Sequence, residues 1–326
     1  MPHADLSALH ELLGPDARPC RRAVTGERGT ALPAFTDHHV HTHLIDEAPL
    51  SRHGIAAVVD LGGDPIALAR RPGGGFPAVA YAGAFLTAPG GYPVGRSWAP
   101  PETTHEITNI SLDAGVPGGV ATAIDEQHTC GASVIKVALN FSSGPVFDLE
   151  TLQAIVASAH ARGLPVVAHV EGEGMLRRAL DAGVDALAHT PFSEWADPAS
   201  IARARAMGQR WISTLSIHDG PGRERATINL TTFAAAGGRV LYGTDLGNGD
   251  RASGIQPDEL AALDSAGVRG PALVAALADP WPLREAPHGV ASFVAGEAPG
   301  SVDEVPAWLA GATVVPTEEL IHDDHR

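Results

Sequence analysis

The chain contains few of the features that define disulfide-rich, membrane or nucleic-acid-binding proteins. Its 326 residues include two cysteines, Cys20 and Cys130, which cannot form a disulfide framework or a cysteine-ligated zinc site. No apolar run approaches the ~18 residues needed to span a membrane, and residues 1–5 lack the basic and apolar segments of a secretory signal. The formal charge of −16 argues against nucleic acid or an anionic membrane as partner. We therefore expect a cytoplasmic protein with a small-molecule partner, and homo-oligomerisation is left open.

Short apolar runs rich in β-branched residues alternate with longer amphipathic segments through most of the chain. Gly163, Gly183 and Gly238 lie where helix C-caps would fall, ahead of the next apolar run. Alternating strands and helices predict a parallel sheet buried on both faces, and eight such units predict an α/β fold, a (β/α)8 TIM-like barrel. Predicted strands lie at 35–40, 56–61, 78–85, 133–137, 165–168, 186–188, 211–214 and 240–242, and predicted helices at 66–70, 120–129, 149–162, 174–182, 198–207 and 228–236.

The segments outside this repeat are expected to cover the barrel. We predict an N-terminal helical cap at 1–33, the barrel at 34–280, and a C-terminal cap at 281–326 that is irregular apart from one strand at 312–315. Residues 87–119 contain too many prolines and glycines for regular structure. Because this long segment follows the third strand, we expect it to form a loop over the active-site face.

The stretch Asp37-x-His39-x-His41 closes the first predicted strand. Side chains alternate along a strand, so His39 and His41 point the same way and can bind one metal ion. An isolated H-x-H triplet is weak evidence, and the neighbouring His38 and His43 leave the pair His41 and His43 as an alternative. The position of Asp37 favours the pair His39 and His41.

Further polar residues end or interrupt other predicted strands. Each alone has an ordinary structural explanation: a histidine can be hydrogen-bonded in the core, and an aspartate can open a turn. An unpaired lysine in a buried strand is costly, however, and requires a partner or a modification. Because strand ends meet on one face of a barrel, the set together favours a metal site. Besides His39 and His41, these residues are Lys136, His169, His189 and Asp245.

These motifs resemble those of the amidohydrolase superfamily, in particular its imidazolonepropionase- and prolidase-like branch. Residues 85–91 also resemble a segment of that branch. Its members usually carry a small β-sandwich built from both chain ends. Here only residues 1–34 precede the first strand, so that side domain should be reduced or absent. The resemblance rests on residues 37–41, 134–136, 166–172, 182–189 and 243–245.

The resemblance implies two divalent metal ions, usually zinc. His39, His41 and Asp245 would hold one ion, and His169 and His189 the other. A carboxylated Lys136 and a hydroxide would bridge them. Only a neutral amine attacks carbon dioxide, and burial of a lysine favours that neutral form.

The expected activity is hydrolysis of an amide-type C–N bond in a dipeptide, an N-acyl amino acid or a cyclic amide. Asp245 would act as general base and then as general acid. Three alternatives stay open: a mononuclear deaminase, a ring-opening imidazolonepropionase-like hydrolase or lactonase with unmodified Lys136, and a catalytically silent ligand-binding barrel. Candidate substrate-binding residues in the loops after the strands are Tyr92, Arg96, Trp98, Asn140 and His218.

Overall fold

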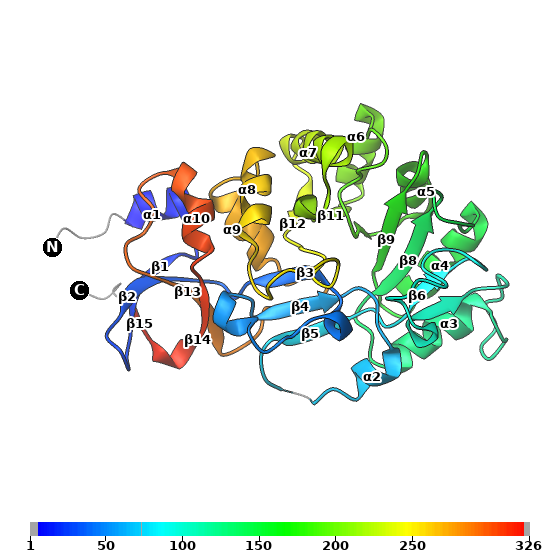
Figure 1. Ribbon diagram of the computed structural model, residues 1–326, viewed down its shortest axis with the longest axis horizontal. Coiled ribbons are helices and arrows are strands. Elements are labelled where there is room, and N and C mark those ends of the chain that lie inside the picture. The colour runs from blue at the N-terminus through cyan, green and yellow to red at the C-terminus, as the bar shows by residue number, and fades with distance from the viewer. Residues whose placement is uncertain (1–5, 73, 323–326) are drawn as a thin grey trace.

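The computed structural model describes residues 6–72 and 74–322 and shows a mixed α/β architecture (Figure 1). Two parallel sheets form its centre, with the strand orders β12-β11-β10-β9-β8-β6-β7 and β3-β4-β5. The strands of the larger sheet are β6 (Phe85–Thr87), β7 (Thr104–Glu106), β8 (Ile135–Asn140), β9 (Val166–Glu171), β10 (Ala186–Leu187), β11 (Arg210–Ile212) and β12 (Arg239–Leu241), and those of the smaller sheet are β3 (Thr36–Val40), β4 (Ala57–Asp60) and β5 (Ala78–Tyr81).

Backbone hydrogen bonds link the two sheets. The amide of His38 in β3 donates to the carbonyl of Tyr242, directly after β12, at 3.0 Å. On the other side of the smaller sheet, the amide of Ser133, just before β8, donates to the carbonyl of Tyr81 in β5 at 2.8 Å. The carboxyl ends of β3 and β12 therefore lie beside each other, although about 200 residues separate them in the chain.

Helices follow most of the parallel strands. Aspartates cap three of them: Asp64, Asp148 and Asp197 each accept a backbone N–H of the first turn at 2.8–2.9 Å. The helices are α2 (Pro65–Ala69), α3 (Val120–Thr129), α4 (Leu149–His160), α5 (Met175–Ala182), α6 (Pro198–Ala206), α7 (Gly220–Ala235), α8 (Pro257–Ser265) and α9 (Pro271–Ala278).

The structure corrects three predicted elements. The helix predicted at 228–236 begins eight residues earlier, at Gly220, because proline and glycine are tolerated in the first turn of a helix. The strand predicted at 78–85 is divided into β5 and β6 at Gly83, which has a φ of 75°. Residues 87–119 are not entirely irregular, since β7 lies within them and pairs with β6.

A separate five-stranded antiparallel sheet contains segments from both ends of the chain, in the order β14-β13-β2-β1-β15. It encloses a small apolar cluster that includes Cys20 and Phe293. Figure 1 shows it at one end of the molecule, close to two short helices and both termini. Its strands are β1 (Arg18–Arg22), β2 (Arg28–Leu32), β13 (Val290–Ala295), β14 (Thr313–Pro316) and β15 (Leu320–His322), and the helices are α1 (Leu6–Leu13) and α10 (Val305–Leu309).

The predicted helical N-terminal cap is therefore incomplete, and the predicted irregular C-terminal cap is wrong except for the strand near residue 313. The strands are short, and β1 carries three arginines in five residues, so apolar alternation is hidden. Their pairing also joins positions some 300 residues apart, such as Cys20 and His322. Among the described residues, no helix combines the length and apolarity needed to cross a membrane.

Candidate metal centre

All six residues predicted as metal ligands are buried, with at most 7% of the surface of each exposed. Five of them lie in the carboxyl-terminal halves of parallel strands or just beyond the strand ends, where side chains from neighbouring strands converge. Lys136 lies deeper, as the second residue of β8. The six are His39 and His41 at the end of β3, Lys136 in β8, His169 in β9, His189 after β10, and Asp245 after β12.

Asp245 lies at the centre of this group. Its Oδ1 is 3.2 Å from His39 Nε2 and 3.3 Å from His41 Nε2. Its backbone has a φ of 54°, a left-handed conformation that aspartate tolerates better than most residues. The backbone amide of Asp245 donates to the carbonyl of His39 at 2.7 Å, which holds its loop against β3.

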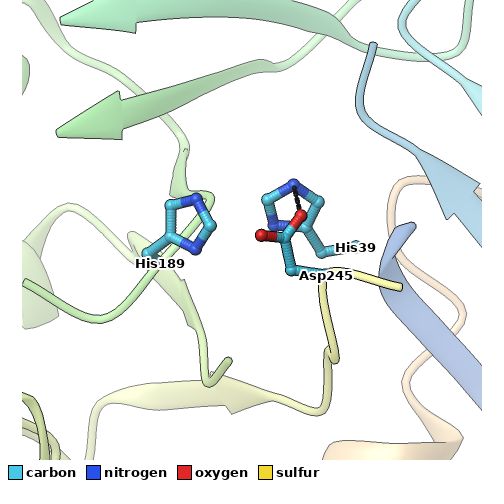
Figure 2. Close-up of side chains that lie close together, drawn as sticks. All are labelled: His39, His189 and Asp245. Atoms are coloured by element: carbon cyan, nitrogen blue, oxygen red, sulfur yellow. Dashed lines mark ion pairs between the residues drawn. The ribbon is translucent and has the colours of Figure 1, made fainter. Parts of the chain in front are cut away.

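One nitrogen of His39, one of His189 and one oxygen of Asp245 lie within 4.8 Å of one another. Figure 2 shows the Asp245 carboxylate against the His39 imidazole, with the pair between them marked, and the His189 imidazole to one side of both. Two imidazoles and one carboxylate at this spacing can hold a divalent ion. His41, Lys136 and His169 surround this compact group without belonging to it.

Three of the histidines keep Nε2 for a ligand, because Nδ1 is already hydrogen-bonded. His39 Nδ1 donates to the carbonyl of Ala188 at 2.8 Å, and His41 Nδ1 donates to the carbonyl of Gly62 at 3.1 Å. His189 Nδ1 lies 2.9 Å from the hydroxyl of Thr214. Metal-binding histidines are commonly held in this way, with the second ring nitrogen on an oxygen acceptor.

His39 Nε2 is buried and makes no hydrogen bond with any described residue, although Asp245 Oδ1 lies 3.2 Å away. A buried polar atom without a partner is costly unless something binds it. Its position beside Asp245 and His189 shows that the residues present suit a metal ion.

His169 has the opposite arrangement. Its Nε2 donates to Glu171 Oε2 at 3.2 Å, so Nδ1 is the nitrogen left for a ligand. Asn140 Nδ2 donates to the same Oε2 at 2.7 Å. Glu171 is a site residue that the sequence analysis missed, although the spacing His169-x-Glu171 places both side chains on one face of β9.

Lys136 is the only lysine in the chain. Its Nζ lies 5.6 Å from the centre of the Phe85 ring and has no ion-pair partner in the described part of the chain. Burial lowers the pKa of Lys136 to about 7, so a substantial share of the amine is neutral at neutral pH.

The protonation states of the group suit metal binding. Burial lowers the pKa values of His39 and His189 well below the ordinary range, so both imidazoles are neutral. Burial raises the pKa of Asp245, but the adjacent imidazoles of His39 and His41, the latter through a hydrogen bond, outweigh it and keep the pKa well below its usual range. For His41, burial lowers the pKa, and its hydrogen bond with Asp245 gives a net increase. A bound cation would take the place of this shared proton.

Asp37 supports the site without belonging to it. It accepts hydrogen bonds from the backbone amides of His39 and Thr244, both at 3.1 Å, and from the Thr244 hydroxyl at 2.5 Å. It thus ties the end of β3 to the loop of Asp245, and burial raises its pKa to about 7.

His38 and His43 do not belong to the group. Both ring nitrogens of His38 contact backbone carbonyls, at 2.7 Å and 2.8 Å. The ring of His43 is exposed, and its Nε2 lies 3.5 Å from the carbonyl of Trp98. The geometry therefore favours the pair His39 and His41 over the pair His41 and His43.

The predicted substrate-binding residues lie around the same group. The Tyr92 ring stacks on His169 with 5.1 Å between centres, and the Trp98 ring lies 6.1 Å from that of His41. The Arg96 guanidinium is 5.9 Å from the Tyr92 ring. The His218 ring is 6.1 Å from that of His189, and burial lowers the pKa of His218 to about 4. The long loop thus contacts two of the six candidate ligands.

Three other polar atoms in this region are buried without hydrogen-bond partners among residues 6–72 and 74–322. They are Asn140 Oδ1, His218 Nε2 and Thr87 Oγ1. Together with His39 Nε2, they mark the carboxyl ends of the strands as a place where a ligand would complete the hydrogen bonding.

No protein-family model and no curated protein matches the sequence. Among solved structures, an Aspergillus niger ochratoxinase is similar, with a TM-score of 0.66 and 20% identity over 91% of this chain and 86% of that chain. A Xaa-Pro dipeptidase with methionine bound in its active site has a TM-score of 0.65 and 17% identity, over 90% and 86% of the two chains. An amidohydrolase has a TM-score of 0.62 and 20% identity, over 91% and 87%. The chain therefore has the fold of these amidohydrolase-type structures, as its motifs predict.

Proposed function

We propose that this protein is a metal-dependent hydrolase that cleaves an amide-type C–N bond in a small molecule. The observation that carries the proposal is the buried group of His39, His189 and Asp245, in which His39 Nε2 makes no hydrogen bond. The fold supports it, because a dipeptidase, an ochratoxinase and an amidohydrolase share it. We also infer that the two linked parallel sheets form one (β/α)8 barrel, with its strand ends around this group.

The proposed centre holds two divalent ions, most simply zinc. His39, His41 and Asp245 would hold one, and His169 and His189 the other, with carboxylated Lys136 between them. When bound, the metal supplies Lewis-acid activation of water and of the scissile carbonyl.

The residues of the chain perform the proton transfers. Asp245 is ionised and lies among the candidate ligands, so it accepts a proton from the attacking water and returns it to the leaving nitrogen. His39 and His41 keep its Oδ1 in place, and Asn248 Nδ2 donates to its Oδ2 at 2.9 Å. Tyr92 and Trp98 of the long loop cover one side of the group, against His169 and His41.

One measurement tests the metal assignment directly. Elemental mass spectrometry of protein purified without chelator should give about two ions per chain. Absence of metal, even after reconstitution with zinc and bicarbonate, would contradict the proposal.

The single lysine makes the carbamate equally easy to test. Incubation with ¹³C-labelled bicarbonate should give one side-chain carbamate signal in the NMR spectrum, and Lys136→Met should remove it. The variant also separates this signal from a carbamate on the N-terminal amine.

The compact group of three ligands favours one alternative, a mononuclear deaminase or ring-opening hydrolase. In that case His169 and the unmodified Lys136 would contact substrate rather than metal. About one ion per chain, with no carbamate signal, would support it.

A further inference from the structure

Asn140 and Glu171 are the last residues of two neighbouring strands, β8 and β9, and pair with each other in register. The preceding pair on the same face of the two strands is Ala138 and His169. Since a strand rises about 3.3 Å per residue, Asn140 and Glu171 lie roughly 7 Å further toward the open end than His169. The pair therefore lies next to the candidate metal ligand His169, on the side of the carboxyl ends of the strands.

Hydrogen bonding orients the Asn140 amide. Its Nδ2 donates to Glu171 Oε2 at 2.7 Å, and a carboxylate can only accept, so the nitrogen must face Glu171. Asn140 is 3% exposed, and its Oδ1 has no hydrogen-bond partner in the described ranges. Glu171 Oε2 also accepts from His169 Nε2, whereas none of the described residues donates to Oε1.

The two atoms without a donor, Asn140 Oδ1 and Glu171 Oε1, are both hydrogen-bond acceptors, and the second belongs to a carboxylate. Among the described residues, Glu171 forms no ion pair with an arginine, and the only lysine of the chain is Lys136. A protonated amine complements this arrangement best, because it offers three N–H donors and a positive charge. A carboxylate would instead leave the Asn140 oxygen unsatisfied and face the charge of Glu171, and an acylated nitrogen would offer a single N–H and no positive charge.

We propose that Asn140 and Glu171 bind a protonated amino group of the substrate. The inference rests on the proposed hydrolase function and narrows its substrates to amides that carry a free amine near the scissile carbonyl, such as dipeptides with a free N-terminus. N-Acyl amino acids are then poor substrates, because their nitrogen carries no charge and only one proton.

The test compares two substrates that differ only in the ammonium group, L-alanine p-nitroanilide and propionic acid p-nitroanilide. Charge-assisted hydrogen bonds of this kind strengthen binding about tenfold to hundredfold. The wild-type kcat/KM should therefore favour the alanine compound by that ratio. Glu171→Gln should reduce the ratio to about one, mainly because the alanine compound is cleaved more slowly. Metal should be retained, because the glutamine oxygen can still accept from His169 Nε2. Glu173→Gln, two residues further on and exposed, is the matched control and should keep the wild-type ratio.

Two results would overturn the inference while leaving the hydrolase intact. One is a wild-type enzyme that cleaves both compounds equally well. The other is a Glu171→Gln variant in which both rates and metal content fall together, since Glu171 would then act only by positioning His169.

Cleavage of neither compound would count against the proposed function, and binding would then test the amine site separately. Calorimetry on the zinc-loaded protein would compare L-alanine hydroxamate with propionohydroxamate. Tighter binding of the amine compound, lost in Glu171→Gln, supports the amine site, and equal binding refutes it.

Discussion

Replacement of Lys136 by methionine should stabilise the metal-free protein, and the size of the effect follows from the buried amine. Lys136 is 1% exposed, and burial lowers its pKa from the ordinary 10.5 to about 7. A pKa difference of about 3.5 units, at about 1.36 kcal/mol each, lowers the free energy of unfolding by about 4–5 kcal/mol when Lys136 is protonated in both the folded and the unfolded state.

The pH dependence has a definite sign. The folded-state pKa lies below the unfolded one, so between about pH 7 and pH 10.5 the unfolded chain binds the proton and the folded chain does not. The penalty is about 4 kcal/mol at pH 7 and about 2 kcal/mol at pH 9, and it disappears above the unfolded pKa. Lys136→Met should therefore raise the free energy of unfolding most at pH 7, and the advantage should halve by pH 9.

Urea unfolding followed by circular dichroism, on chelator-treated protein in bicarbonate-free buffer, measures both values. The substitution changes the packing equally at both pH values. A pH-dependent change in the stability difference between variant and wild type therefore reports the charge of Lys136 alone. A stability difference between variant and wild type that stays the same at pH 7 and pH 9 would refute a buried, weakly basic Lys136. With zinc and bicarbonate present the wild type should instead be the more stable protein, because only the wild type can form the bridging carbamate.

Three further changes test other parts of the structure. Asp245→Asn should lower kcat by about 10²–10⁴-fold while metal is retained, as expected for loss of a general base, and near-normal turnover would remove Asp245 from the proton transfers. Thr214→Ala should weaken metal binding about 10–100-fold in a chelator competition, because His189 Nδ1 loses its partner, whereas Thr214→Ser should retain it. Gly83→Ala should destabilise the fold by about 1–3 kcal/mol, since a Cβ there would lie 2.0 Å from Gln127 Oε1. Gly163→Ala, with a similar φ of 72° and open space around it, should cost less in the same urea titration.

Local patterns in the sequence determined most of the parallel strands and the identity of the candidate ligands. Alternation along β3 separates His39 and His41 from His38, and the rule that parallel strands end on one face predicts that His169, His189 and Asp245 lie near them. The sequence shows these features because strand periodicity and the alternation of strands with helices are local patterns.

Contacts between distant segments were decided by tertiary structure alone. The pairing of β1 with β15 joins residues some 300 positions apart, and neither strand shows the apolar alternation that would reveal it. The choice of ring nitrogen in His39 and His189 depends on Ala188 and Thr214, which no spacing in the sequence connects to them. The open acceptors of Asn140 and Glu171 likewise arise only because β8 and β9 end side by side. A sequence shows which groups a chain possesses. The partner of each group depends on which strands the fold places side by side, and that partner decides the charge of the group and the hydrogen bonds it can still make with a ligand.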